Sequence, residues 1–175
     1  MKWLSRILAP VLVVLLIVMA LPLVTGAQDD QEVHIRESII RVVEEGFNQG
    51  NVAVVDELFS PDYVAYVPGQ EEPDTIEDFK ADIVEIRTVM PDFTATADPI
   101  IVEGNWAAFR FTGQGTFTGA AEGWPPPTNA PVVFTANIIL RFDEEGLAIE
   151  EWDEFDNLSF LIQTGAINPE ELFGE

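Results

Sequence analysis

Hydrophobic and polar positions change their spacing near residue 92, and this change divides the chain into two parts. Before it, apolar residues recur at the spacing of one helix face, and after it they alternate as in strands with one buried side. Helices are predicted over 31–48, 51–59 and 75–90, with a short extended segment over 60–69. Strands are predicted over 93–102, 106–117 and 131–142, and a last strand follows the turn at 143–146 and runs into Trp152.

The third predicted helix has the clearest pattern. Thr75 and Asp78 have the spacing of a capping box, and Pro91 ends the helix. Its apolar stripe consists of Ile76, Phe79, Ile83, Ile86 and Met90. A stripe at this spacing indicates a core-facing helix rather than a cofactor site.

The first predicted helix presents Ile40, Val43 and Phe47 to the core and His34 to solvent. Gly50 is expected to stop this helix, and Asn51 to cap the second one.

The second half of the chain reads as consecutive hairpins. The segment 103–105, Glu-Gly-Asn, is a turn signal, and Pro99 predicts an edge strand or a bulge. Helices first and hairpins later predict an α+β domain rather than alternating βαβ units. We expect a strongly curved antiparallel sheet, wrapped against about three N-terminal helices, with a cone-shaped apolar pocket at the centre.

The first 27 residues have the features of a secretory signal peptide. Lys2 and Arg6 precede an almost wholly apolar run over 7–24, and small residues at 25–27 suit cleavage after Ala27. An uncleaved membrane anchor is the alternative, but the run is short and contains two prolines. We therefore expect residues 28–175 to form a single secreted domain, with no membrane association once the leader is removed.

Composition excludes several classes of function. Asp and Glu total 31 against 8 Lys and Arg, which gives a formal net charge of −23. Nucleic acid and anionic membrane surfaces should repel such a chain. There is no cysteine, so disulfides, thiolate nucleophiles and cysteine–metal sites are excluded.

Candidate chemistry centres on residues 138–165. In this stretch a strand runs into Trp152, and Asp156 opens a short amphipathic helix. Arg110 lies among apolar neighbours in the middle of its predicted strand, which indicates either a cavity residue or a structural ion pair. Tyr63 and Tyr66 either line a cavity or pack at the surface, and the Pro-rich loop carrying Trp124 is either a lid or a stiff connector.

The chain resembles the SnoaL-like polyketide cyclase and ester cyclase family of the nuclear transport factor 2-like (NTF2-like) superfamily, over roughly residues 37–165. The segments that carry the resemblance are 47–51, 55–59, 61–63, 79–80, 91–93, 103–105 with Arg110, 115–119, 126–128, and 141–142 through 151–165 with Asp156.

The resemblance implies a cone with an apolar pocket that binds an apolar small molecule, without metal or organic cofactor. It implies Asp156 as general acid/base, with Arg110 beside it. The residues expected to bind the substrate are Tyr63, Tyr66, Trp106, Phe117, Trp124, Asn137 and Trp152. The chain departs from the family at two places, which leaves fewer polar residues for the pocket. Phe117 and the segment 65–67 stand where family members often carry histidine.

Three hypotheses follow. The chain is an exported cyclase, isomerase or hydrolase acting through Asp156, or a non-catalytic secreted carrier of a hydrophobic ligand. Alternatively, it is a homodimeric scaffold that uses the outer face of its sheet and has a filled cavity. An open pocket that contains Asp156 near Arg110 or a tyrosine favours the first hypothesis. An open pocket with Asp156 facing solvent favours the second, and a cone filled by Phe117, Trp106 and Trp152 favours the third.

Overall fold

The computed structural model describes residues 22–170, so most of the predicted signal peptide lies outside the described residues. The helices are α2 (Pro22–Arg41), the π-helical η1 (Val42–Asn48), α3 (Ala53–Leu58), α4 (Ile76–Val89) and α5 (Asn157–Gln163). The strands are β1 (Phe59–Tyr66), β2 (Asp74–Thr75), β3 (Thr94–Glu103), β4 (Trp106–Thr116), β5 (Pro131–Phe142) and β6 (Ala148–Phe155).

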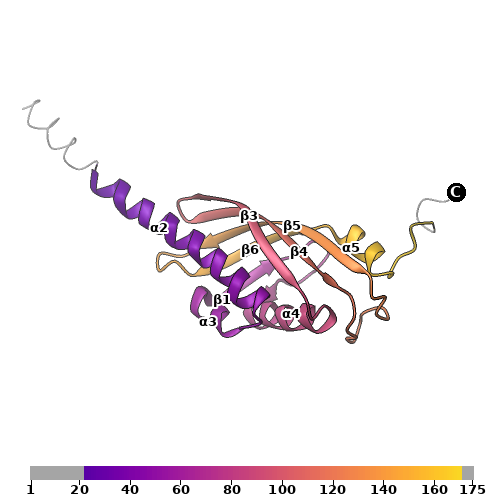
Figure 1. Cartoon of the computed structure of the whole chain (residues 1–175). Helices are drawn as coiled ribbons and strands as arrows, with labels where there is room; N and C mark the ends of the chain where they lie inside the picture. The colour runs from indigo at the N-terminus through magenta and orange to yellow at the C-terminus, as the bar shows by residue number, and fades with distance from the viewer. Residues whose placement is uncertain (1–21, 171–175) are drawn as a thin grey trace, which may run out of the picture.

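One mixed sheet organises the domain. Its strand order is β2-β1-β6-β5-β4-β3, and every neighbouring pair is antiparallel except β1 and β6. The strands from β3 to β6 curve over α3 and α4, and α2 extends away from the body at its N-terminal end (Figure 1). The predicted α+β architecture with a curved sheet is therefore confirmed.

Hairpin signals in the sequence are found where they were expected. Gly104, in the turn between β3 and β4, has a φ of 61°, which a residue with a side chain rarely adopts. The β3–β4 register shifts between Ala97 and Ile100, so Pro99 lies at an irregularity of an edge strand, as predicted.

Helix boundaries agree with the sequence in part. The Thr75–Asp78 capping box is formed in full. Helix α2 begins at Pro22, earlier than expected, and continues directly into η1. Asn51 was the wrong cap: α3 has Val52 at that position and no side-chain cap.

The core lies between the helices and the inner face of the sheet. Ile35, Ile39 and Val43 are buried on the first helix, whereas Ile40 is 45% exposed, so its predicted core position was wrong. The buried residues Ile35, Ile39, Val42 and Gly46 recur at the spacing of one helix face, and Ile40 lies beside this face rather than on it.

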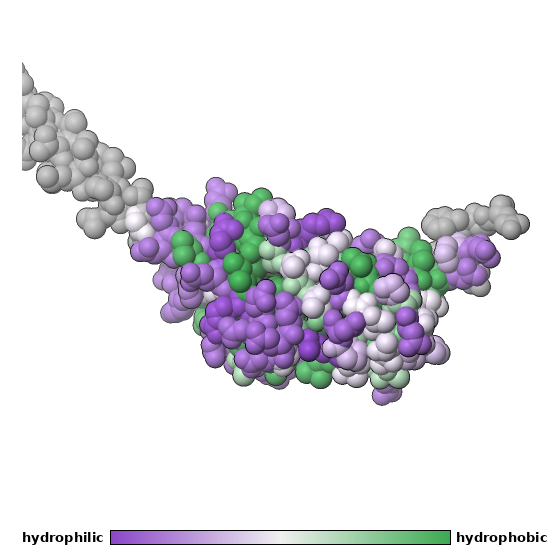
Figure 2. Space-filling model, in the orientation of Figure 1, coloured by the Kyte–Doolittle hydropathy of each residue, from purple (hydrophilic) through white to green (hydrophobic). Residues whose placement is uncertain are grey.

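Hydrophilic residues cover most of the visible surface, with smaller hydrophobic areas between them (Figure 2). Within residues 22–170, no helix has the length and apolar character needed to cross a membrane.

Candidate functional site

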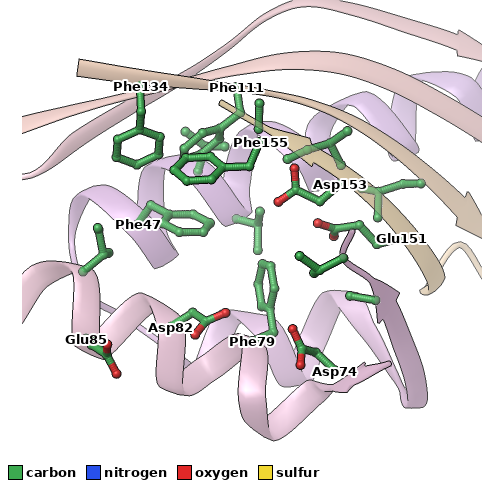
Figure 3. A pocket seen from close by; sticks show the side chains of 18 of the residues that line it. Phe47, Asp74, Phe79, Asp82, Glu85, Phe111, Phe134, Glu151, Asp153 and Phe155 are labelled. Carbon is green, nitrogen blue, oxygen red and sulfur yellow. The ribbon is translucent and has the colours of Figure 1, made fainter. Parts of the chain in front are cut away.

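A cavity of about 300 Å³ lies between the inner face of the sheet and the helices. Figure 3 shows its two walls, with α4 on one side and the strands on the other. It is lined mainly by aromatic and aliphatic side chains, among them Phe47, Phe59, Phe79, Phe93, Phe109, Phe111, Trp124, Phe134, Phe155 and Phe160. Its existence confirms that the domain is hollow at the centre.

The aromatic wall follows from strand alternation. Phe109 and Phe111 on β4, Phe134 on β5 and Phe155 on β6 all point inward, because alternate residues of a strand share one face. The ring centroids of Phe134 and Phe155 lie 5.1 Å apart in an edge-to-face arrangement. Such packing holds the rings in defined positions, so the wall is shaped before a ligand arrives.

Five carboxylates interrupt this apolar lining. Glu151 and Asp153 project from β6, Asp74 from β2, and Asp82 and Glu85 from α4. Glu151 is buried and Asp153 half-buried, whereas Asp82 and Glu85 are exposed at the mouth. No Lys, Arg or His is among the described residues that line the cavity.

Glu151 is the most deeply buried of these acids, at 5% exposed. The Tyr63 hydroxyl donates a hydrogen bond of 2.6 Å to its Oε2 atom. Burial raises the pKa of Glu151 to about 8, the Tyr63 hydrogen bond opposes the rise, and the negative charge of Asp153 adds to it. Near neutral pH this carboxyl is therefore largely protonated, and it can donate a proton.

Asp153 lies two residues further along the same face of β6. Its Oδ1 atom is buried and has no hydrogen-bond partner among the described residues. Burial, followed by the charge of Glu154, raises the pKa of Asp153 to about 6. Asp153 is thus a carboxylate near neutral pH, with an unused acceptor atom inside the protein.

The acids at the mouth have different surroundings. Burial of part of the side chain and the charges of Asp74 and Glu85 raise the pKa of Asp82 to about 6. Asp82 is exposed, so solvent screens the charges that act on it. The acid–base assignment therefore uses Glu151 and Asp153. Glu85 accepts a hydrogen bond from the indole N–H of Trp124, which ties the Pro-rich loop to α4.

Two neighbouring carboxyl groups with unequal pKa values form an acid–base pair. Glu151 can give a proton and Asp153 can accept one at the same pH, in a cavity that is otherwise apolar. The described residues contain no group of three His, Asp or Glu side chains placed to hold a metal ion. The arrangement is suited to proton transfer at an uncharged part of a ligand.

Five of the predicted site residues lie on the opposite face of the sheet. Trp106, Arg110, Asn137 and Tyr66 are exposed there, with Trp152 half-buried between them. The Tyr66 and Trp106 rings each stack on Trp152, with centroids 5.6 Å apart. Arg110 pairs in register with Asn137, and the expectation that it is buried is corrected, because strand alternation places it on the face opposite Phe109 and Phe111.

The remaining predictions have mixed outcomes. Trp124 lines the cavity, as expected. Phe117 is fully buried and Tyr63 is 2% exposed, and both lie behind the lining rather than in it. Phe79 and Ile86 of the helical stripe line the cavity, so that stripe is only partly core.

Asp156 caps helix α5 instead of pointing into the cavity. Its Oδ1 atom accepts a hydrogen bond of 3.2 Å from the backbone N–H of Ser159, and the side chain is exposed. It opens the helix as predicted, but it is not among the residues that line the cavity.

The sequence interpretation chose Asp156 over Asp153 and gave Glu151 no role in the site. A signal was present: Glu151, Asp153 and Phe155 share one face of β6, and Trp152 lies on the other. Trp152 was predicted to bind the substrate, whereas the acidic residues of β6 face the cavity.

The model of the SnoaL-like polyketide cyclase family matches residues 37–164. The structure of IdmH from Streptomyces antibioticus, a proposed polyketide cyclase, has a TM-score of 0.64 and 29% identity, covering 75% of this chain and 98% of that one. TsrD from Streptomyces laurentii has a TM-score of 0.67 and 26% identity, covering 77% and 97% of the two chains.

AclR from Streptomyces galilaeus, a proposed hydroxylase, has a TM-score of 0.68 at 22% identity, covering 78% of this chain and 99% of that one. At this identity it shares the fold, and nothing about its activity carries over. A search of curated proteins finds no match.

Proposed function

Because the chain belongs to the SnoaL-like polyketide cyclase family, we propose that its cavity binds an apolar small molecule with a carbonyl group and moves protons on it. The observation that carries this proposal is the pair of carboxyl groups, Glu151 and Asp153, on the cavity side of β6. Their unequal pKa values supply an acid and a base in one apolar enclosure.

The reaction we propose is an intramolecular ring closure. The Asp153 carboxylate takes a proton from the carbon next to a carbonyl, while the Glu151 carboxyl gives its proton to the carbonyl oxygen. The resulting enol carbon attacks a second carbonyl carbon of the same molecule, forming a carbon–carbon bond and an alkoxide. Asp153 then returns its proton to the new alkoxide, and the enol proton regenerates Glu151, so no proton is gained or lost.

Tyr63 has a supporting role in this scheme. Its hydroxyl donates to one oxygen of Glu151 and leaves the other for the ligand. The aromatic wall excludes water and holds the reacting chain folded, which brings the two carbons together.

An exchange assay tests the proposal without the natural substrate. Acetonaphthone in deuterated buffer exchanges its methyl hydrogens only when a base removes them, and NMR follows the loss of the proton signal. We expect the protein to accelerate this exchange, and Asp153→Asn to lose about a hundredfold or more of the acceleration.

Asp156→Asn is the matched control, because it makes the same chemical change outside the cavity. If the protein binds acetonaphthone but exchange is no faster than in buffer, the protein is a non-catalytic carrier. Loss of exchange in Asp156→Asn but not in Asp153→Asn would restore the assignment made from the sequence.

Export and self-association are separate proposals. The basic start and apolar run of residues 1–27 support secretion, which N-terminal sequencing of protein from the culture medium tests. The exposed row of Tyr66, Trp152 and Trp106 supports a homodimer through the outer face of the sheet. Light scattering of wild type and Trp106→Ser tests this, and a monomeric wild type would contradict it.

A further inference from the structure

The charge of the cavity has one sign only. Five carboxyl groups line the cavity from two walls: Asp74, Asp82 and Glu85 from the side of α4, and Glu151 and Asp153 from β6 (Figure 3). The charge of Asp153 acts on both Asp82 and Glu151, so these groups interact across the cavity. Repulsion among them is relieved either when a carboxyl takes up a proton, as Glu151 does, or when a positive charge joins the group.

The described basic side chains do not supply that charge. None of them lines the cavity, and most have partners elsewhere. Lys80 pairs with Asp56 and Glu77, Arg41 with Glu45 and Glu57, and Arg141 with Glu150. Arg36 and Arg87 donate to backbone carbonyls, of Ile100 and of Phe47 respectively.

Asp153 provides independent evidence of a missing partner. Its buried Oδ1 atom accepts no hydrogen bond from any described residue. Buried carboxylate oxygens nearly always have a donor, because leaving one unpaired is costly. A positive charge beside the carboxylate would lower that cost, because it stabilises the ionised form without touching the Oδ1 atom.

The rest of the lining suits an organic cation better than a metal ion. The described residues hold no triad of His, Asp or Glu with ligand geometry. The rings of Phe47 and Phe79 lie on the cavity wall, with centroids 5.9 Å apart, beside the carboxylates. Aromatic faces attract organic cations, and their edges pack against hydrocarbon.

We propose that the ligand carries a protonated amine on its apolar skeleton, held between Asp82 on α4 and Asp153 on β6. This inference rests on the proposed function, since it names the class of molecule that enters the same cavity. The ammonium group pairs with the carboxylates of Asp153 and Asp82 and neutralises the charges that face it. Its hydrocarbon part packs on the phenylalanine wall.

The net charge of the chain acts in the same direction. A formal charge of −23 draws cationic molecules toward the protein and repels anionic ones. This long-range effect weakens with salt, whereas the contact with a buried carboxylate is screened much less. Salt dependence therefore separates general attraction from binding inside the cavity.

Three molecules of one shape test the proposal: naphthylmethylamine, naphthylmethanol and naphthoate, which are cationic, neutral and anionic. Isothermal titration calorimetry at about pH 7.5 and about 0.15 M salt gives their affinities. We expect the amine to bind at least about tenfold more tightly than the alcohol, and naphthoate to bind most weakly.

Two variants locate the preference. Asp153→Asn and Asp82→Asn should each reduce the ratio of amine to alcohol affinity severalfold, while the alcohol itself binds as before. Glu144→Gln removes a charge from the exposed β5–β6 turn and should leave the ratio unchanged. Circular dichroism shows whether each variant is folded.

The preference should also depend on pH. The titratable groups that face the ammonium are Asp74, Asp82, Glu85, Glu151 and Asp153, with Tyr63 behind them. Protonation of Asp82 and Asp153 below about pH 6 should abolish the advantage of the amine.

The possible results separate the amine inference from the proposed function. An alcohol that binds as tightly as the amine, or a ratio unchanged in both cavity variants, overturns the amine inference and leaves the proposed function standing. Failure of all three molecules to bind overturns both. A ratio that falls equally in Glu144→Gln assigns the preference to the overall charge of the chain and also overturns the inference.

Discussion

Glu151→Gln is the perturbation that most directly tests the electrostatics of the cavity. Glutamine has nearly the same shape, can accept the Tyr63 hydrogen bond, and does not titrate. The pKa of Glu151 rises from 4.5 to about 8 on folding, because burial disfavours the charged form. The folded state therefore holds this proton more tightly than the unfolded state does.

The sign of the effect on stability follows from that difference. Glu151 costs nothing below about pH 4.5, where both states are protonated, and its cost grows as the pH rises toward about 8, where the folded state finally ionises. A difference of about 3.5 pH units at about 1.36 kcal/mol per unit gives an upper bound of about 5 kcal/mol. Relaxation of the protein and entry of water reduce it, so we expect about 2–4 kcal/mol.

Urea unfolding at about pH 5 and about pH 8 measures the effect, with tryptophan fluorescence as the probe. Wild type should lose stability between these values, and Glu151→Gln should lose about 2–4 kcal/mol less over the same range. Glu144→Gln, an exposed charge change on the turn, should behave as wild type. Equal pH dependence in wild type and Glu151→Gln would refute a buried, protonated Glu151.

Three further predictions concern the supports of the site. Tyr63→Phe removes the hydrogen bond that lowers the pKa of Glu151, so the alkaline limb of the exchange-rate profile should move to higher pH; an unmoved limb would show that this hydrogen bond does not tune the acid. Gly113→Ala would place a Cβ atom 2.5 Å from Cζ of Phe134 in the aromatic wall, and calorimetry should show a loss of about 1–3 kcal/mol. Thr75→Ala removes the cap of α4, and urea unfolding should show a loss of about 1 kcal/mol, whereas Thr75→Ser should keep most of the stability.

The fold could be predicted from local patterns because each element carries its own signals. The capping box at Thr75, the turn at Gly104 and the alternation of β4 each depend on residues close in the sequence. The strand β2 was missed, because two residues inside an acidic loop have no period to recognise. Its pairing with β1 nonetheless places Asp74 on the cavity.

The candidate site was harder to predict because alternation defines two faces without saying which one is inside. Trp106, Arg110 and Asn137 were correctly grouped with one another, but on the outer face. The other face of the sheet lines the cavity, and it carries Phe109, Phe111 and the two acids of β6. A choice that is off by one residue reverses every side chain in a strand.

By itself, the sequence determined the family, the order of the helices and of the longer strands, the capping of α4 and α5, and the strong negative charge of the protein. These properties depend on spacing along the chain and on composition, which no tertiary contact alters. The tertiary structure alone decided which carboxylates are buried. The pKa of Glu151 depends on the removal of water by residues from η1, α4, β1 and the sheet, and on a hydroxyl supplied by Tyr63, 88 positions away. Solvent exclusion is a property of the assembled walls, so Glu151 and Asp153 acquire their chemistry only when the cone closes around them.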